Sequence, residues 1–422
     1  MNEEEFRELL TETQEYISRH YASALSDGEK TEQLRAYIAK YLKDRGTDPA
    51  GTELVARLYE EMAEYSVLTP LLSDPRVEEI NLNAWDELWV HYRDGRAERV
   101  RSFSSPEKAL DIVRRLLRHA GAVLDNATPI AQGHLPGNKR ITAIKTPVVD
   151  ERTAVAASLR MLNAEPLTLT ELIAQGTADA EMLGFLCDCL CYGVSFVVAG
   201  PTSSGKTTLL NSLVGAIPPG RRIFSIESGA RELHFCHVGE ADPSGPQDHL
   251  KVQTLSRPSE KAELDVSQEA LGVAALRFSP ELIAIGEMRD TEAATAVEAS
   301  LTGHTVVSTI HAGSAENCHL RLALLCQKRF PIEFSASMMQ TVLAFPVVVN
   351  AARMPDHSRK IVAITEACVT PEGKICYRPL YQWEGGTFVR KNAPGEKLTD
   401  LMIRHGLDMK GGSAWLGSRS SS

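Results

Sequence analysis

A glycine-rich stretch at residues 200–208, GPTSSGKTT, carries residue types that bind phosphate groups. Two glycines separated by four residues let the backbone curl, so that its N–H groups face phosphate oxygens. The lysine after the second glycine can place its charge on the β- and γ-phosphates, and the next threonine can offer its hydroxyl to Mg²⁺. The predicted nucleotide-binding residues are Gly200, Pro201, Thr202, Ser203, Ser204, Gly205, Lys206, Thr207 and Thr208, with Thr207 as a Mg²⁺ ligand.

The stretch also has the context that a phosphate-binding loop requires. The apolar run at 196–199, FVVA, predicts a buried strand before the loop. Leu209, Leu213 and Ile217 predict a helix with an apolar face after it. A chance turn of glycine and serine would lack these neighbours. We therefore expect this loop to bind ATP, with the phosphates at the start of the helix.

Two glutamates downstream of the loop are candidates for the chemistry of hydrolysis. Glu227 ends the apolar run in RRIFSIE, and Glu287 follows the apolar run in ELIAIGE. In a parallel sheet both would project toward the edge that holds the loop. Either glutamate alone would more often be a solvated strand end, but beside the loop both are predicted site residues. Which of them activates water stays open, and Glu287 is expected to hold Mg²⁺ directly or through water.

Two histidines, His304 and His311, flank the predicted strand in GHTVVSTIHAG. Seven residues of extended chain separate their backbones by about 20 Å, so they cannot share a metal ion. His304 follows a predicted helix at 291–301, which we expect to begin after Asp290 as N-cap and to bury Ala293, Val297 and Leu301. It either braces the turn or takes part in chemistry. His311, at the strand's carboxyl end, is expected to sense the γ-phosphate.

The elements that would position these residues follow from hydrophobic periodicity and turn signals. Residues 1–66 predict a helical extension with three helices, and 67–164 an α+β domain. In that domain we expect strands at 79–82 and 88–92, a hairpin turn at Asp94-Gly95, and one helix. That helix should run from Ser105 as N-cap to near Gly121, with Leu110, Val113 and Leu117 on its apolar side.

The larger second part, 165–390, alternates strands and helices as far as about residue 385, which predicts a parallel α/β sheet. A linker at 163–169 precedes it, and a long polar loop at 235–249 interrupts it. Residues 391–422 are expected to form a C-terminal segment with a frayed tail.

Composition restricts the class of protein. The 422 residues are 43% hydrophobic and 24% charged, as in soluble globular proteins, with a formal net charge of −10 that argues against a broad nucleic-acid-binding surface. The sequence has no run of eighteen apolar residues and an acidic start, so we expect a cytoplasmic protein. Cys187, Cys189 and Cys191 are interpreted as apolar residues of a buried helix, with a zinc site as the alternative.

Four stretches, in order, resemble motifs of a known family. GPTSSGKTTLLNSL, IESGARELHF, LIAIGEMRDTEAATA and TGHTVVSTIHAGSAEN resemble the Walker A, Asp box, Walker B and His box of the traffic ATPases of type II and type IV secretion systems. PLLSDPRVEEINLNAWDELWVHYRDGR resembles the start of the N-terminal domain in the CpaF/TadA branch, which serves Tad-type pili, and in its relatives in conjugative type IV secretion. The resemblance covers about residues 67–385.

The resemblance implies a RecA-like ATPase domain that works as a homohexamer on an inner-membrane platform, peripheral at the cytoplasmic face. By motif position it assigns catalytic roles to Glu227, Glu287, Arg289, His304 and His311, and nucleotide contacts to Arg140 and Arg160. Three features depart from the family pattern: Ser228 replaces an acid, His134 replaces an arginine, and the tetracysteine zinc module of type II secretion and pilus extension ATPases is absent from the sequence.

The sequence is therefore compatible with three functions. The leading one is an ATP-hydrolysing motor of a secretion, conjugation or pilus machine. The second is a nucleotide-gated assembly or binding protein, in which the departures at Ser228 and His134 slow hydrolysis. The third is a small-molecule kinase or a helicase. The sequence shows no evident acceptor pocket for a kinase, and its acidic balance gives no basic surface for a helicase.

Overall fold

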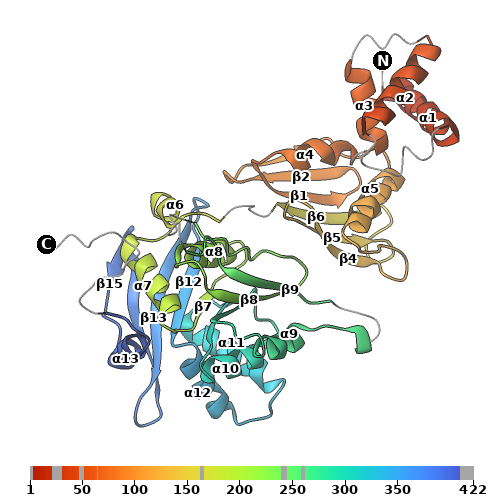
Figure 1. Cartoon of the computed structure of the whole chain (residues 1–422). Helices are drawn as coiled ribbons and strands as arrows, with labels where there is room; N and C mark the ends of the chain where they lie inside the picture. Colours follow the sequence, from red (N-terminus) through yellow and green to blue (C-terminus); the bar gives the residue numbers. More distant parts are fainter. Residues whose placement is uncertain are drawn as a thin grey trace. The chain divides into compact units, whose positions relative to one another are not determined.

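The computed structural model describes residues 3–20, 31–46, 52–63, 65–161, 166–238, 245–257 and 262–408. The chain divides into two compact units, Met1–Leu162 and Asn163–Ser422 (Figure 1). Within the described ranges, no helix combines the length and apolarity needed to span a bilayer. The predicted tail, and parts of the predicted linker and polar loop, lie outside these ranges.

The first unit begins with three helices, as predicted for residues 3–66. They are α1 (Glu3–His20), α2 (Thr31–Asp44) and α3 (Thr52–Ala63). Their apolar faces meet in a small core of their own, formed by Phe6, Leu9, Ile17, Leu34, Ile38, Leu42, Leu58 and Tyr59. Residues at helical spacing thus bury one stripe of each helix.

A six-stranded antiparallel sheet follows, after a 3₁₀ turn (Ser66–Leu68) and α4 (Thr69–Ser73). Its strands are β1 (Val77–Ala84), β2 (Glu87–Tyr92), β3 (Ala97–Val100), β4 (Ile130–Leu135), β5 (Lys139–Lys145) and β6 (Val155–Met161), in the order β3-β2-β1-β6-β5-β4. The predicted turn between β2 and β3 is confirmed: Gly95 has φ +86° and donates its N–H to the Tyr92 carbonyl.

Helix α5 (Pro106–His119) packs on this sheet against β4, β5 and β6. Ser105 caps it as predicted, because its side chain accepts the Lys108 N–H. Val113 and Leu117 are buried as predicted, and Leu110 is partly buried against the same core; Ile112 and Leu116 are buried as well. The face that meets the sheet is therefore broader than the predicted stripe.

The second unit contains a nine-stranded sheet in the order β15-β14-β13-β12-β7-β11-β10-β8-β9. The strands are β7 (Phe196–Ala199), β8 (Arg222–Glu227), β9 (Leu250–Leu255), β10 (Leu282–Ile285), β11 (Thr305–Ile310), β12 (Val347–Arg353), β13 (Arg359–Val369), β14 (Ile375–Glu384) and β15 (Thr387–Arg390). The six strands from β12 to β9 pair in parallel, as expected. The expectation of parallel alternation to residue 385 is wrong, because β13, β14 and β15 extend the sheet as antiparallel hairpins.

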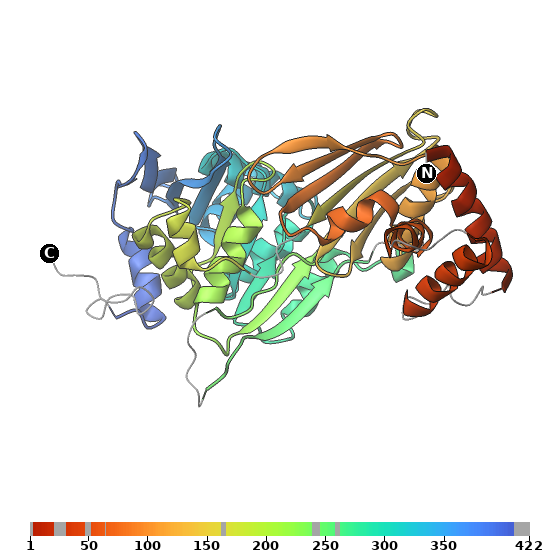
Figure 2. The same cartoon turned by 90° about the horizontal axis from the view of Figure 1, so that it is seen from above.

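Helices cover both faces of this sheet (Figure 1, Figure 2). They are α6 (Leu169–Ala174), α7 (Ala180–Cys191), α8 (Lys206–Ala216), α9 (Gln268–Ala275), α10 (Glu292–Leu301), α11 (Ala315–Gln327), α12 (Phe334–Ala344) and α13 (Glu396–Arg404), with a 3₁₀ turn at Ala262–Leu264. Alternate residues of β7 face the helices on the two sides of the sheet. Phe196 and Val198 join one core with α7, α8 and α13, while Val197 and Ala199 join another with α10 and α11.

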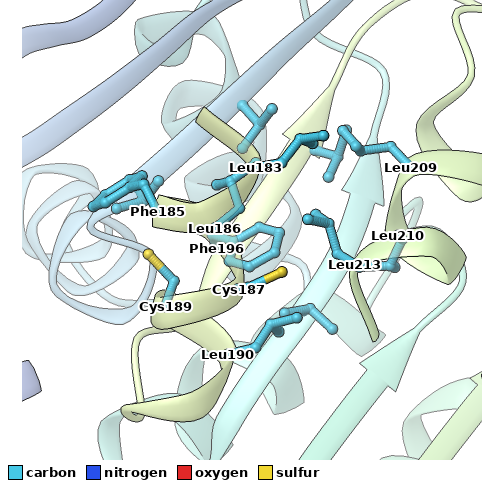
Figure 3. Packing of buried hydrophobic residues seen from close by; sticks show 14 of the residues in the cluster. Leu183, Phe185, Leu186, Cys187, Cys189, Leu190, Phe196, Leu209, Leu210 and Leu213 are labelled. Atoms are coloured by element: carbon cyan, nitrogen blue, oxygen red, sulfur yellow. The ribbon is translucent and has the colours of Figure 1, made fainter. Parts of the chain in front are cut away.

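The cysteines of α7 lie in the first of these cores. Cys187 and Cys189 are fully buried, and Figure 3 shows them among Leu186, Leu190 and Phe196. Burial raises the pKa of the Cys187 and Cys189 thiols far above the ordinary value. Their interpretation as small apolar residues of a buried helix is confirmed.

Candidate nucleotide site

The loop at residues 200–205 joins β7 to α8 at the carboxyl edge of the parallel strands. Gly205 caps α8 with φ +87°, a left-handed conformation that residues with a Cβ rarely adopt. At Gly200 a Cβ would lie well inside 3.0 Å from the carbonyl oxygen of Ala351 on β12. Both glycines of the predicted motif are therefore required by the geometry of this loop.

Lys206 brings its positive charge into the loop. It is only 8% exposed, and its Nζ donates hydrogen bonds to the carbonyl oxygens of Gly200 at 3.0 Å and Pro201 at 2.8 Å. Thr207 and Thr208 follow in the first turn of α8, where backbone N–H groups have no partner within the helix. The ammonium and the helix start together form a site suited to an anion.

The remaining residues of the motif shape the loop. The Ser204 hydroxyl is buried and donates to the Pro201 carbonyl at 2.9 Å. Ser203 has φ +61°, an uncommon conformation outside glycine, and Thr202 is exposed. The loop is thus held by its own internal hydrogen bonds.

Glu287 and His311 meet beside this loop. Glu287 lies two residues after β10, and His311 follows β11, the strand between β10 and β7. His311 Nε2 is 3.0 Å from Glu287 Oε1. Glu287 Oε1 accepts no hydrogen bond from the described residues, so the two atoms are close but are not hydrogen-bonded. The other oxygen, Oε2, accepts from Arg289 Nη2.

These contacts set the charge of both groups. Burial alone would raise the pKa of Glu287, but the Arg289 guanidinium, His311 and Lys206 outweigh it and lower the pKa below its ordinary value. Burial lowers the pKa of His311, and the nearby Lys206 ammonium lowers it further. At neutral pH the pair is therefore a carboxylate beside a neutral imidazole.

Glu227 ends β8 next to β10, as the sequence indicates, but it turns toward its own loop. Its side chain is 3% exposed, and Oε1 accepts the N–H groups of Glu232 and Leu233. Burial raises the pKa of Glu227 to about 7, against the lowering effect of these hydrogen bonds. Its Oε2 is buried and accepts no hydrogen bond within the described part of the chain. Gly286 lies against its Cγ, so Glu227 is close to the Glu287 segment.

The start of helix α10 differs from the prediction by one residue. Thr291, not Asp290, is the N-cap, and the Glu292 carboxylate in the first turn accepts the N–H groups of Arg289 and Asp290, which precede the helix. The Asp290 carboxylate instead pairs with Lys328 Nζ at 2.9 Å. Leu301, expected to be buried, is 44% exposed, because α10 ends there at the surface.

His304 lies apart from these groups. It precedes β11, at the amino end of the parallel strands, whereas His311 follows the same strand at the carboxyl end. The backbone N–H of His304 donates to the Ala299 carbonyl, but its Nδ1 is buried and has no hydrogen-bond partner among the described residues. The six residues of β11 therefore separate His304 from Glu287.

Residues 61–379 match the type II/IV secretion system protein family, a span of more than half the chain. The chain belongs to this family.

The relatives are distant. The chain is 29% identical over 320 residues to an uncharacterised protein of Methanocaldococcus jannaschii, a match that covers 75% of this chain and 55% of that protein. It is 29% identical over 327 residues to the type IV secretion system protein PtlH of Bordetella pertussis, covering 70% and 92%. Among solved structures it is similar to the VirB11 ATPase of the Brucella suis type IV secretion system, with a TM-score of 0.36, 23% identity, and coverage of 70% and 94%.

In this member of the type II/IV secretion family, the second unit has a RecA-like P-loop fold. The strand that carries the loop, β7, and the strand that leads to Glu287, β10, are separated by β11. This order places His311 between the loop and the acid. The phosphate-binding loop, Glu287 and His311 thus lie together at one edge of the sheet, as the sequence predicts.

Arg140 and Arg160 lie in the first unit, on β5 and β6, directly opposite each other. Glu79 on β1 is opposite Arg160, and His134 on β4 is opposite Arg140. The four residues form one row on the sheet face opposite the buried Ile80, Leu159 and Ile141. The two arginines predicted to contact the nucleotide are therefore neighbours within the first unit.

Arg359 is a site residue that sequence reasoning missed. It begins β13, and its Nε donates to the Ser203 carbonyl at 3.1 Å. It also helps to line a cavity of about 310 Å³ beside the loop, formed by Leu167, Leu172, Gln175, Thr177, Ser204, Gly205, Thr208, Leu209, Ala351, His357, Ser358, Arg359, Lys360 and Ile361. Only the pairing of β12 with both β7 and β13 places Arg359 at the loop.

Proposed function

We propose that this protein binds and hydrolyses ATP. The observation that carries the proposal is the contact between Glu287 and His311 at the carboxyl end of the strands, beside the loop that holds Lys206. An anion-binding loop alone binds nucleotide, whereas hydrolysis needs a group that orients or deprotonates water near the γ-phosphate. Glu287 supplies an ionised carboxylate in that position, since its pKa is lowered.

The residues of the site take distinct roles in this proposal. Lys206 and the loop N–H groups bind the β- and γ-phosphates. Glu287 orients the attacking water, and the neutral His311 imidazole, in contact with it, responds to the γ-phosphate. Glu227, with a pKa raised to about 7, is a second carboxyl group that can exchange a proton near neutral pH. Arg289 holds Glu287 in its ionised form.

The donor set also fits Mg²⁺. Thr207 provides a hydroxyl in the first turn of α8, and Glu287 Oε1 is a buried carboxylate oxygen that accepts no hydrogen bond from the described residues. Oxygen ligands of this kind are those that Mg²⁺ prefers. Bound with ATP, the ion would neutralise charge that develops on the phosphates.

At the level of the machine, we propose that the protein powers a type IV secretion, conjugation or Tad-type pilus apparatus of the CpaF/TadA type. It would act as a homohexamer on inner-membrane platform proteins, at the cytoplasmic face of that membrane. Family membership over residues 61–379 supports this proposal, as does the similarity to PtlH, a type IV secretion system protein. In this assembly Arg140 and Arg160 would contact the nucleotide.

A nucleotide-gated assembly protein is the second candidate. The Arg289 guanidinium already occupies Glu287 Oε2, and His311 Nε2 lies 3.0 Å from Oε1. Ser228 also stands where the family pattern has an acid. Binding without turnover would follow if these contacts persisted with ATP bound.

Phosphate release and binding of a fluorescent ATP analogue, measured on the full chain with Mg²⁺, separate the two candidates. Lys206→Ala is expected to weaken binding, while Glu287→Gln should keep binding and lower turnover by about 100-fold or more. Glu298→Gln, at an exposed position on α10, is the matched control and should behave as the parent. Binding without hydrolysis in the parent, or a parental rate in Glu287→Gln, would refute the hydrolysis proposal.

Light scattering with and without ATP tests the assembly. A mass six times that of the chain is expected at working concentration. A monomeric mass under every nucleotide condition would contradict the hexamer, whatever the rate of hydrolysis.

A further inference from the structure

Two free cysteines face each other across neighbouring strands, far along β13 from Arg359 and the P-loop. Cys368 on β13 is directly opposite Cys376 on β14 in the antiparallel ladder. Because directly opposite residues point to the same face of a sheet, both thiols lie on one side of this hairpin. Cys376 is exposed and Cys368 is partly exposed, so reagents in solution can reach the pair.

The position in the ladder fixes how far apart the two residues are. The Thr370 N–H donates to the Lys374 carbonyl, and hydrogen-bonded and non-hydrogen-bonded pairs alternate along antiparallel strands. Cys368 and Cys376, two pairs further on, therefore occupy a hydrogen-bonded position. Their Cα atoms are then about 5.5 Å apart, within the range that a disulfide spans.

The same position makes a disulfide strained. Opposite Cβ atoms in hydrogen-bonded pairs lie near the upper end of about 4.5–5.5 Å, whereas a relaxed disulfide needs about 3.8 Å. Closing the bond must draw the strands together. The hairpin can yield, because the tip residues Pro371, Glu372 and Lys374 are exposed. Strained and exposed disulfides are reduced more easily than structural ones.

The remaining cysteines are poor competitors for this chemistry. Burial raises the pKa of five thiols, those of Cys187, Cys189, Cys191, Cys318 and Cys326, which reduces the reactive thiolate form. Cys236 is exposed, and its Sγ lies 3.3 Å from Lys251 Nζ, so it can form a mixed disulfide; no described strand pairing places a second cysteine opposite it. Among the strands described, the ladder pairs only Cys368 and Cys376 as opposite cysteines.

We propose that Cys368 and Cys376 form a reversible dithiol–disulfide pair that exchanges with small disulfides such as glutathione disulfide. One thiolate attacks a glutathione sulfur and releases the first reduced glutathione, leaving a mixed disulfide. The second thiolate then attacks the protein sulfur of that bond and releases a second reduced glutathione. Two protein thiols are oxidised, one glutathione disulfide is reduced, and the two thiol protons pass to the released glutathione thiolates.

Trypsin digestion of the full chain reads out this bond directly, because Lys374 lies between the two cysteines. Cleavage after Lys360, Lys374 and Arg390 yields peptides 361–374 and 375–390, each with one cysteine, since the Arg378-Pro379 bond resists trypsin. The protein is equilibrated in buffers of rising glutathione disulfide, quenched, and blocked with N-ethylmaleimide. Mass spectrometry then shows the two peptides either joined or separately blocked.

The parent is expected to give the joined species in glutathione disulfide and to lose it on return to excess reduced glutathione. Cys236→Ser, the matched control, should give the same joined species, and Cys368→Ser should leave Cys376 blocked or carrying one glutathione. Separately blocked peptides at every ratio would overturn the proposal. So would two stable mixed disulfides, a link between two chains on a non-reducing gel, or a bond that survives excess reduced glutathione.

Discussion

Replacing Glu227 by glutamine tests the electrostatics of the buried carboxyl group. Burial raises the pKa of Glu227 from an ordinary value of 4.5 to about 7. Each pKa unit corresponds to about 1.4 kcal/mol, so ionising the buried group costs the folded state about 3 kcal/mol. Glutamine stays neutral at every pH and keeps an oxygen for the N–H groups of Glu232 and Leu233.

The sign of the effect follows from proton binding. Between pH 4.5 and about 7 the folded state holds the Glu227 proton more tightly than the unfolded chain does, so stability falls as pH rises through this window. Relative to the parent, Glu227→Gln should therefore gain about 3 kcal/mol in free energy of unfolding from pH 4.5 to pH 8. Urea denaturation of both proteins across this range measures the difference, in which the contributions of unchanged groups cancel.

Glu227→Ala is the companion variant. It should lose the same pH dependence but be less stable than Glu227→Gln at every pH, because two N–H groups lose their acceptor. A difference between Glu227→Gln and the parent that does not vary with pH would refute the raised pKa. A difference of opposite sign would mean that the hydrogen bonds to the carboxylate outweigh its burial.

Three further substitutions test the P-loop and its neighbours. Gly200→Ala should lower the free energy of unfolding by about 1–3 kcal/mol, since its Cβ collides with the β12 backbone; an unchanged thermal midpoint would contradict this. Arg289→Ala should raise the pKa of Glu287 and move the acid limb of the ATPase pH profile to higher pH, and Arg289→Lys should move it less. Arg359→Ala, which frees the Ser203 carbonyl, should weaken ATP binding by about fivefold through a looser loop; parental affinity in a titration would rule out this support.

Part of this site could be predicted from the sequence because parallel strands impose a rule on their ends. Once β7, β10 and β11 are identified as neighbouring parallel strands, the residues after them must converge at one edge. The loop glycines, Glu287 and His311 follow from that rule alone. The same rule separates His304 from them, since it precedes β11 at the opposite edge.

The remaining features depend on contacts that no local pattern encodes. Arg359 reaches the loop only because β12 pairs with both β7 and β13, which lie far apart in the sequence. Glu227 turns inward because two N–H groups of the following loop bind it, although its strand-end position predicted a side chain directed at the edge that holds the P-loop. Asp290 is a good capping residue by type, but its carboxylate pairs with Lys328, and α10 begins one residue later, at Thr291.

The position of Lys206 has a consequence for the thermodynamics of anion binding. Its ammonium is removed from water by folding itself and is held by two loop carbonyls, of Gly200 and Pro201. An anion that enters the loop exchanges for these carbonyls and does not have to strip water from the cation. The free energy of dehydrating the ammonium thus lowers the stability of the folded state and does not weaken anion binding. Removing the charge should therefore increase stability in the absence of ligand while it weakens affinity, so the two quantities change in opposite directions at this one side chain.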